Sequence, residues 1–151
     1  MPDERPLVFA YDGSSYAKEA IAEAGRELRS GRRAVVLTIR EPLEQVPFMS
    51  TLGTSVDAGT FAALQESAEQ EATGVAEEGA ELARAAGFEA EARVEAWPTP
   101  WERIVEVGEE LDAGLIVIGS RGLTGLKRAV IGSVAAAVAQ HSGRSVLIVH
   151  S

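Results

Sequence analysis

GLIVIGSRGLTGLKRAVIGSVAAA, residues 114–137, predicts a buried strand, a glycine-rich loop and the start of a helix. The run Leu115–Ile118 is continuously apolar, which is typical of a strand covered on both faces. Gly119, Gly122 and Gly132 lack a Cβ, so the backbone can turn sharply there or approach another group closely. Exposed N–H groups in such a loop and at a helix start bind anionic oxygens. We therefore interpret the stretch as a site for the phosphates of a nucleotide.

The glycine spacing separates this loop from two common phosphate-binding motifs. Its pattern is Gly119-x2-Gly122-x9-Gly132-Ser133, in which Ser133 adds a hydroxyl at the helix entrance. A P-loop needs Gly-Lys-Ser/Thr from the fifth position after its first glycine, where this chain has Thr124. A dinucleotide fingerprint places its three glycines within six residues, directly after the first strand. The alternative interpretation is that these glycines serve tight turns alone.

Length and composition restrict the class of protein. The chain has 151 residues, 46% apolar and only 5% aromatic, which predicts one domain over residues 1–151 with a core of Val, Leu, Ile and Ala. The absence of cysteine excludes disulfides, thiolate metal sites and a cysteine nucleophile. No stretch approaches the ~20 apolar residues that span a bilayer, and no leader peptide is recognisable. We expect a cytoplasmic protein without a membrane partner.

Charge is unevenly distributed along the chain. The net charge of −9 argues against a nucleic-acid partner. Residues 113–151 carry four basic and no acidic residues, whereas residues 1–112 carry 10 basic and 23 acidic ones. Arg121, Lys127 and Arg128 lie inside the glycine loop, where they supply the positive field that an acidic protein needs to hold a polyphosphate. Chance placement of surface charge is the alternative.

The remaining chain alternates predicted strands and helices. Apolar runs predict strands at residues 6–11, 34–39 and 145–149, and residues 88–96 alternate as an edge strand does. Thr99-Pro100-Trp101-Glu102 predicts a helix start with a capping box. We expect residues 42–59 to form a long loop, which either lies over a bound ligand or is an ordered surface loop or dimer contact. A long helix over residues 57–86 is predicted to bury Phe61, Leu64, Ala68, Ala72, Val75, Gly79, Leu82 and Ala86.

Strict alternation of strands and helices requires a parallel sheet with right-handed crossovers. We expect an α/β, Rossmann-like, three-layer domain whose five strands take the order 3-2-1-4-5, with the alternating third strand at an edge. The ligand crevice of such a sheet opens at the carboxyl ends of strands 1 and 4. The turn Asp12-Gly13-Ser14-Ser15 follows strand 1 and the glycine loop follows strand 4. This coincidence supports the site independently of any known family.

The chain resembles the universal stress protein family, whose ATP-binding members carry G-x2-G-x9-G-(S/T) after their fourth strand. All four fixed positions match. The resemblance extends from Leu7 to Val149 and includes the Asp12-Gly13-Ser14 turn, Glu41-Pro42, LDAGLIVIGSRG, IGSVAAAVAQHS and SVLIV. Trp97-Pro98 departs from a glycine that is common before the third helix, and Ala135 departs from a hydroxyl found in some members.

The resemblance implies an ATP site, with ADP or AMP as alternatives and Mg²⁺ as a companion ion. By it, Asp12 holds the adenine or ribose end, Ile39 meets the base through its backbone, and Gly119 to Gly122 follow the ribose and α-phosphate. Gly132 to Val134 would cradle the outer phosphates, and the glycines are expected to face the ligand. The full candidate set is Ala10, Tyr11, Asp12, Ile39, Gly119, Ser120, Arg121, Gly122, Lys127, Arg128, Gly132, Ser133 and Val134.

Three functional hypotheses follow. The first is an ATP-binding stress or regulatory protein, and the second is a dimeric interaction module that no longer binds nucleotide. The third is a weak ATPase or another enzyme of adenine-containing ligands; because Asp12 is the one carboxylate that can be assigned to the crevice, we expect slow hydrolysis at most. The apolar final strand, Ser145–Val149, predicts a homodimer through its open edge, as is common in the resembled family.

Overall fold

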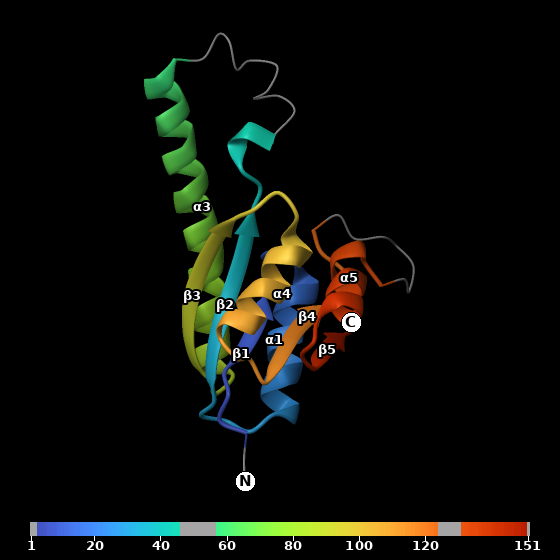
Figure 1. The fold of residues 1–151 in the computed structure, drawn as a ribbon. Coiled ribbons are helices and arrows are strands. Elements are labelled where there is room, and N and C mark those ends of the chain that lie inside the picture. The colour runs from blue at the N-terminus through green and yellow to red at the C-terminus, as the bar shows by residue number, and fades with distance from the viewer. Residues whose placement is uncertain (1–2, 46–56, 124–130, 151) are drawn as a thin grey trace.

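The computed structural model describes residues 3–45, 57–123 and 131–150. Within these ranges the chain folds into a five-stranded parallel sheet between two layers of helices (Figure 1). The apolar part of the long predicted loop lies outside the described residues, as do Lys127 and Arg128. In the described part of the chain, no helix combines the length and apolarity needed to cross a membrane.

Strands and helices alternate as the sequence predicts, and the strand order is β3-β2-β1-β4-β5. This confirms the predicted order and puts the alternating third strand at an edge. Parallel pairing sets Val8 of the central strand opposite Val35 on one side and Ile116 on the other. The elements are β1 (Leu7–Ala10), α1 (Ser15–Glu27), β2 (Arg33–Arg40), the 3-10 helix η1 (Leu43–Gln45), α3 (Ala58–Ala85), β3 (Glu89–Ala96), α4 (Pro100–Glu110), β4 (Leu115–Gly119), α5 (Ser133–His141) and β5 (Val146–Val149).

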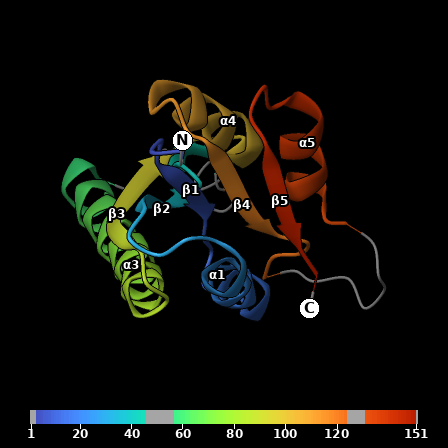
Figure 2. The same cartoon turned by 90° about the horizontal axis from the view of Figure 1, so that it is seen from below.

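Two apolar cores lie on the two faces of the sheet. Figure 2 shows α1 and α3 on one face and α4 and α5 on the other. Because successive side chains of a strand point to opposite faces, neighbouring residues of β1 serve different cores. Phe9 packs in the core beneath α1 and α3, and Val8 packs in the core beneath α4 and α5. Both faces are therefore covered, as a parallel sheet requires.

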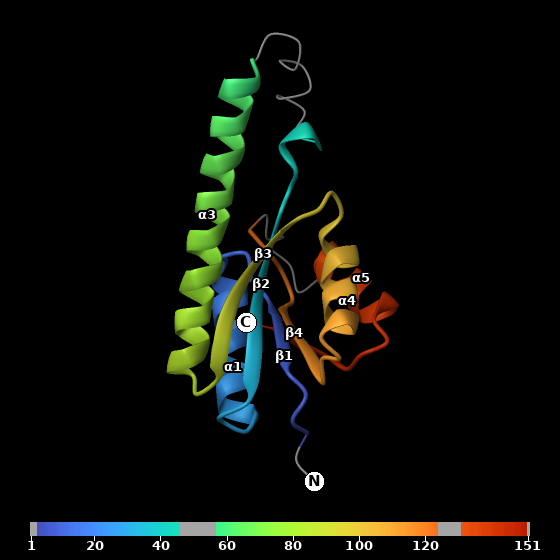
Figure 3. The ribbon, with the colours of Figure 1, turned by 60° about the vertical axis from the view of Figure 1, so that its left-hand side comes forward.

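The predicted apolar stripe of α3 is partly wrong. The buried residues of α3 are Ala72, Ala76, Gly79, Ala80 and Ala83, while Leu64 and Leu82 are 40% and 38% exposed. One reason is that the amino-terminal half of α3 extends beyond the strands (Figure 3), so no sheet lies beneath it. The other is that the small residues allow a close approach that larger ones would prevent. A Cβ on Gly79 would lie 2.7 Å from Tyr11 and Val36.

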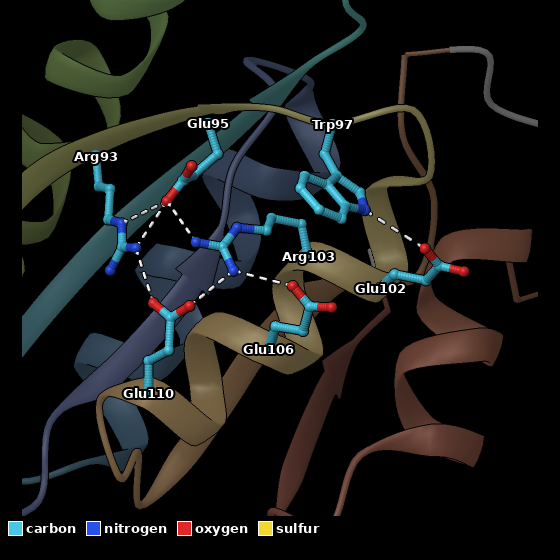
Figure 4. Close-up of polar contacts among 7 residues, drawn as sticks. All are labelled: Arg93, Glu95, Trp97, Glu102, Arg103, Glu106 and Glu110. Atoms are coloured by element: carbon cyan, nitrogen blue, oxygen red, sulfur yellow. Dashed lines mark hydrogen bonds and ion pairs between the residues drawn. The ribbon is translucent and has the colours of Figure 1, made fainter.

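A network of charged side chains joins β3 to α4 (Figure 4). The carboxylate of Glu95 accepts hydrogen bonds from Arg93 at 2.7 Å and from Arg103 at 3.0 Å, and both arginines also bind Glu110. Burial acts to raise the pKa of the Glu95 carboxyl, but these hydrogen bonds outweigh it, so the pKa lies below its usual value. The network fixes α4, whose first turn borders the site described below.

The predicted capping box at the start of α4 is wrong. Thr99 occupies the N-cap position and Pro100 the first helical position, but the Thr99 side chain accepts no cap hydrogen bond. The carboxylate of Glu102 accepts instead from the indole N–H of Trp97 at 3.4 Å (Figure 4). The start of the helix was therefore predicted correctly from Pro100 and the residue spacing. The reciprocal hydrogen bonds of a capping box, between the side chains of Thr99 and Glu102 and the backbone, do not form.

Candidate functional site

A cavity of about 310 Å³ opens at the carboxyl ends of β1, β2 and β4. The turn after β1, the end of β2, the first turn of α4, the loop after β4 and the start of α5 border it. The structure brings eleven of the candidate residues together there, and Lys127 and Arg128 lie outside the described ranges. Those eleven are Ala10, Tyr11, Asp12, Ile39, Gly119, Ser120, Arg121, Gly122, Gly132, Ser133 and Val134.

The start of α5 supplies hydrogen-bond donors to the cavity. Gly132 is the N-cap residue, and its own N–H is already used by the carbonyl of Ser120 at 2.6 Å. The first intrahelical bond runs from the N–H of Ala136 to the carbonyl of Gly132. The intervening N–H groups of Ser133, Val134 and Ala135 make no hydrogen bond to the described part of the chain. Three donors at the positive end of a helix dipole can bind an anion.

Asp12 ties together the two loops that border the cavity. Its carboxylate accepts from the N–H of Ser14 at 2.9 Å and, through its other oxygen, from the N–H of Leu123 at 3.2 Å. The turn after β1 and the loop after β4 are thereby held at a fixed separation. Each carboxylate oxygen has a second acceptor position, so Asp12 can also bind a hydroxyl or amino group of a ligand.

Tyr11 borders the cavity through its backbone rather than its side chain. The ring packs in the core beneath α1 and α3, and its hydroxyl donates to the carboxylate of Glu78. Burial, together with the hydrogen bond to this carboxylate, raises the pKa of Tyr11 well above its usual value. The carbonyl of Tyr11 accepts from the hydroxyl of Thr38 at 2.9 Å, which fixes the strand end just before Asp12.

The cavity also has an apolar lining, which sequence analysis largely missed. Leu37, Ile104 and Ile118 come from three elements and belong to the same buried core. Their meeting depends on how α4 packs across the strands, which no local sequence pattern encodes. The predicted helix start at Pro100 was the one sequence feature that indicated a helix near this part of the cavity. The cavity-lining residues absent from the prediction are Ala17, Leu37, Pro100, Ile104, Ile118, Leu123 and Ala135.

The three motif glycines make room for other parts of the protein, which corrects the expectation that they face a ligand. A Cβ on Gly119 would lie 2.9 Å from backbone atoms of Tyr16, so α1 can pack against β4 only if this residue is glycine. A Cβ on Gly122 would lie 2.7 Å from the carboxylate of Asp12, and one on Gly132 would lie 3.2 Å from the carbonyl of Ser120. The glycines therefore bring the bordering loops into contact and shape the cavity indirectly.

The described lining of the cavity carries one acidic and one basic side chain, Asp12 and Arg121. No cluster of three or more His, Asp or Glu side chains with metal-binding geometry occurs within residues 3–45, 57–123 and 131–150. In nucleotide sites Mg²⁺ is held by one or two carboxylates together with the ligand's phosphates. Asp12 can supply one such carboxylate.

A family model matches nearly the whole sequence. The model of the universal stress protein family matches residues 4–150. The chain belongs to the universal stress protein family. Within it, universal stress protein YxiE of Bacillus subtilis strain 168 is 30% identical over 145 residues, which cover 95% of this chain and 97% of that relative.

Solved structures show the same fold. The hypothetical protein MJ0577 has a TM-score of 0.77 at 21% identity, over 98% of this chain and 96% of that one. A universal stress protein in complex with cAMP has a TM-score of 0.61 at 26% identity, over 99% and 98% of the two chains. A third structure, from Archaeoglobus fulgidus in complex with dAMP, has a TM-score of 0.58 at 21% identity, over 98% of both chains. This member of the family thus has the α/β fold of its structural neighbours.

Proposed function

We propose that this universal stress protein binds an adenine nucleotide, with ATP as the predicted ligand, in the cavity at the ends of β1 and β4. The proposal depends on one observation, namely that the cavity has two chemically different ends. Uncommitted backbone N–H groups of Ser133, Val134 and Ala135 border one end. Leu37 and Ile104 make the other end apolar. Such a site suits a ligand that has phosphates at one end and a flat base at the other.

The complexes of neighbouring proteins support the class of ligand. One universal stress protein is bound to cAMP and another to dAMP, and both ligands are adenine nucleotides. In this chain we propose that the phosphates contact the start of α5, that Asp12 contacts the ribose or base, and that Ile39 borders the base. Lys127 and Arg128 add positive charge in the same loop of the sequence. ATP is named first because the glycine pattern matches that of the family's ATP-binding members, and ADP and AMP are the alternatives.

We propose a regulatory role for the bound nucleotide in the cytoplasm, with slow hydrolysis at most. Hydrolysis requires a water molecule positioned by a base and stabilisation of charge on the transferred phosphoryl group. Among the described residues of the lining, Asp12 is the one carboxylate, and two N–H groups already fix its position. Bound Mg²⁺ would therefore be held mainly by the phosphates. The nucleotide would act by stabilising one conformation or selecting a protein partner.

We also propose a homodimer formed through β5. This strand is at the edge of the sheet, pairs only with β4 among the described strands, and contains no charged residue. An open apolar edge of this kind favours pairing with a second strand, and a two-fold axis would supply the same strand of a second copy.

Isothermal titration calorimetry tests the nucleotide proposal. ATP, ADP, AMP and cAMP are titrated into the wild type and into the Gly122→Val and Gly132→Val variants. We expect the wild type to bind ATP and each variant to lose binding, because the added side chain moves Asp12 or the Ser120 carbonyl at the border of the cavity. Gly74→Val is the matched control, since a Cβ on Gly74 has no neighbouring atom within 4 Å. Normal ATP binding by both site variants would show that the nucleotide binds elsewhere.

A further inference from the structure

Tyr16, in the first turn of α1, contacts the glycine loop at two points. The first is a backbone contact: a Cβ on Gly119 would lie 2.9 Å from the carbonyl carbon and oxygen of Tyr16. The second is a side-chain contact, in which the Arg121 guanidinium carbon lies 5.6 Å from the centre of the Tyr16 ring. These two loop residues flank Ser120. Tyr16 is therefore fixed against the loop by its backbone while its ring supports the arginine.

The side chain of Arg121 has no acidic partner among the described residues. Among the described residues, Arg93, Arg103 and Arg144 form ion pairs with glutamates, whereas Arg29, Arg32 and Arg33, like Arg121, form none. Arg121 differs from these in that its guanidinium lies over the ring of Tyr16. A guanidinium that lies over an aromatic ring keeps its in-plane N–H donors available for another acceptor. The guanidinium is thus charged, and its N–H donors have no acidic partner among the described residues.

The backbone of Arg121 lies beside the start of α5. A Cβ on Gly132 would lie 3.5 Å from the Cα of Arg121, and the N–H of Gly132 donates to the carbonyl of the preceding residue, Ser120. The backbone of Arg121 therefore lies near the first turn of α5, where the N–H groups of Ser133 and Val134 are uncommitted. Arg121 and these N–H groups line the same cavity, so the charge of the arginine and the positive end of the helix dipole both favour an anion there.

We propose that Tyr16 is a positioning residue that holds Arg121 ready to bind phosphate, and that this pair lets the site distinguish adenine nucleotides from adenosine. The inference rests on the proposed nucleotide site and adds a determinant of its specificity. The aromatic ring restricts the rotamers of a long side chain before the ligand arrives, so less conformational entropy is lost when a phosphate binds. Adenosine has no phosphate and gains nothing from the stacked arginine.

Calorimetry with ATP, AMP and adenosine tests the proposal on four variants: Tyr16→Phe, Tyr16→Leu, Arg121→Met and the double variant Tyr16→Leu/Arg121→Met. Tyr16→Phe keeps the ring and should bind like the wild type. Tyr16→Leu should weaken ATP and AMP about two- to fivefold, as expected for a half-buried cation–π pair, and leave adenosine unchanged. In the Arg121→Met background, loss of the ring should change ATP affinity less than twofold, because the residue that it positions is absent.

Each contrary outcome has a distinct meaning. Equal weakening of ATP and adenosine by Tyr16→Leu would show that the ring only packs the site, which overturns the proposal. An unchanged ratio of ATP to adenosine affinity in Arg121→Met would overturn it as well, whatever the stability of the Tyr16 variants. If the wild type binds no nucleotide at all, the proposed function itself fails. If the wild type binds ATP and Tyr16→Leu binds it equally well, only the positioning role fails.

Discussion

Replacing Gly119 with alanine should destabilise the protein. The added Cβ would lie 2.9 Å from the carbonyl carbon and oxygen of Tyr16, whereas ordinary contacts of a Cβ lie at 3.4–4 Å. Because both Tyr16 atoms belong to the backbone of α1, no rotamer change can relieve the overlap. The helix must move away from β4 by about half an ångström, the difference between those distances. Overpacking of this kind costs about 1–3 kcal/mol of unfolding free energy.

A second alanine substitution provides the control. Gly74 lies in the interior of α3, and a Cβ there would have no neighbouring atom within 4 Å. Gly74→Ala should raise the unfolding free energy by about 0.5–1 kcal/mol, because alanine loses less backbone entropy in a helix. The same chemical change is thus expected to have opposite effects at the two positions.

Urea unfolding followed by circular dichroism measures both variants. If the unfolding free energy falls with urea concentration at the same slope in each variant as in the wild type, a shift in the unfolding midpoint measures a change in stability. For a chain of this length, each kcal/mol corresponds to about 2–4 °C in Tm, so Gly119→Ala should melt about 2–12 °C lower. If Gly119→Ala is at least as stable as the wild type, the close packing of α1 on β4 is refuted.

Three further predictions address the charge network, the loop cations and the sheet edge. The pKa of the Glu95 carboxyl is lowered, so its ionised form stabilises the fold above about pH 4.5, the ordinary pKa of glutamate, and this contribution is lost as the pH falls through the folded-state pKa. Glu95→Gln should therefore reduce the loss of unfolding free energy on acidification, and an acid profile identical to that of the wild type would contradict the role of the network. Replacing Lys127 and Arg128 with alanine should weaken ATP more than adenosine in calorimetry, whereas equal losses would argue against a role at the phosphates. Ile116 lies opposite Val146 and donates its N–H to the carbonyl of Ser145, so we infer that the N–H of Val146 points away from β4, toward the open edge. Val146→Pro removes this N–H, and light scattering should find a dimer for the wild type and a monomer for the variant. A variant that stays dimeric would exclude β5 as the interface.

The sequence predicts the sheet well because local signals were strong. The run at Leu115–Ile118 is apolar on both faces, and the alternation after Phe88 marks an edge strand, so the strand order could be inferred from topology rules. The position of the cavity followed from the two turns at the carboxyl ends of β1 and β4. Gly132 is the N-cap residue of α5, at the predicted helix start. It is suited to this position because a side chain there would lie close to the carbonyl of Ser120.

Features that depend on tertiary packing could not be predicted. The predicted stripe of α3 mixed large residues such as Leu64 with small ones such as Ala72. The helix extends beyond the sheet, so Leu64 is exposed, and the residues that it buries are alanines and one glycine. The apolar wall of the cavity includes Ile104, whose position depends on how α4 crosses the strands. Glycine is necessary at position 119 because of a contact with Tyr16 of α1, which is far away in the sequence and so cannot be inferred from the local pattern.

A crystal structure of the wild-type protein grown with ATP tests the central claim most directly. The account predicts density for the nucleotide in the cavity at the ends of β1 and β4, with phosphate oxygens within hydrogen-bond distance of the N–H groups of Ser133, Val134 or Ala135. It also predicts that the base contacts the apolar side near Ile39. A cavity filled by the protein's own side chains in saturating ATP, or a nucleotide bound at another surface, would contradict the account.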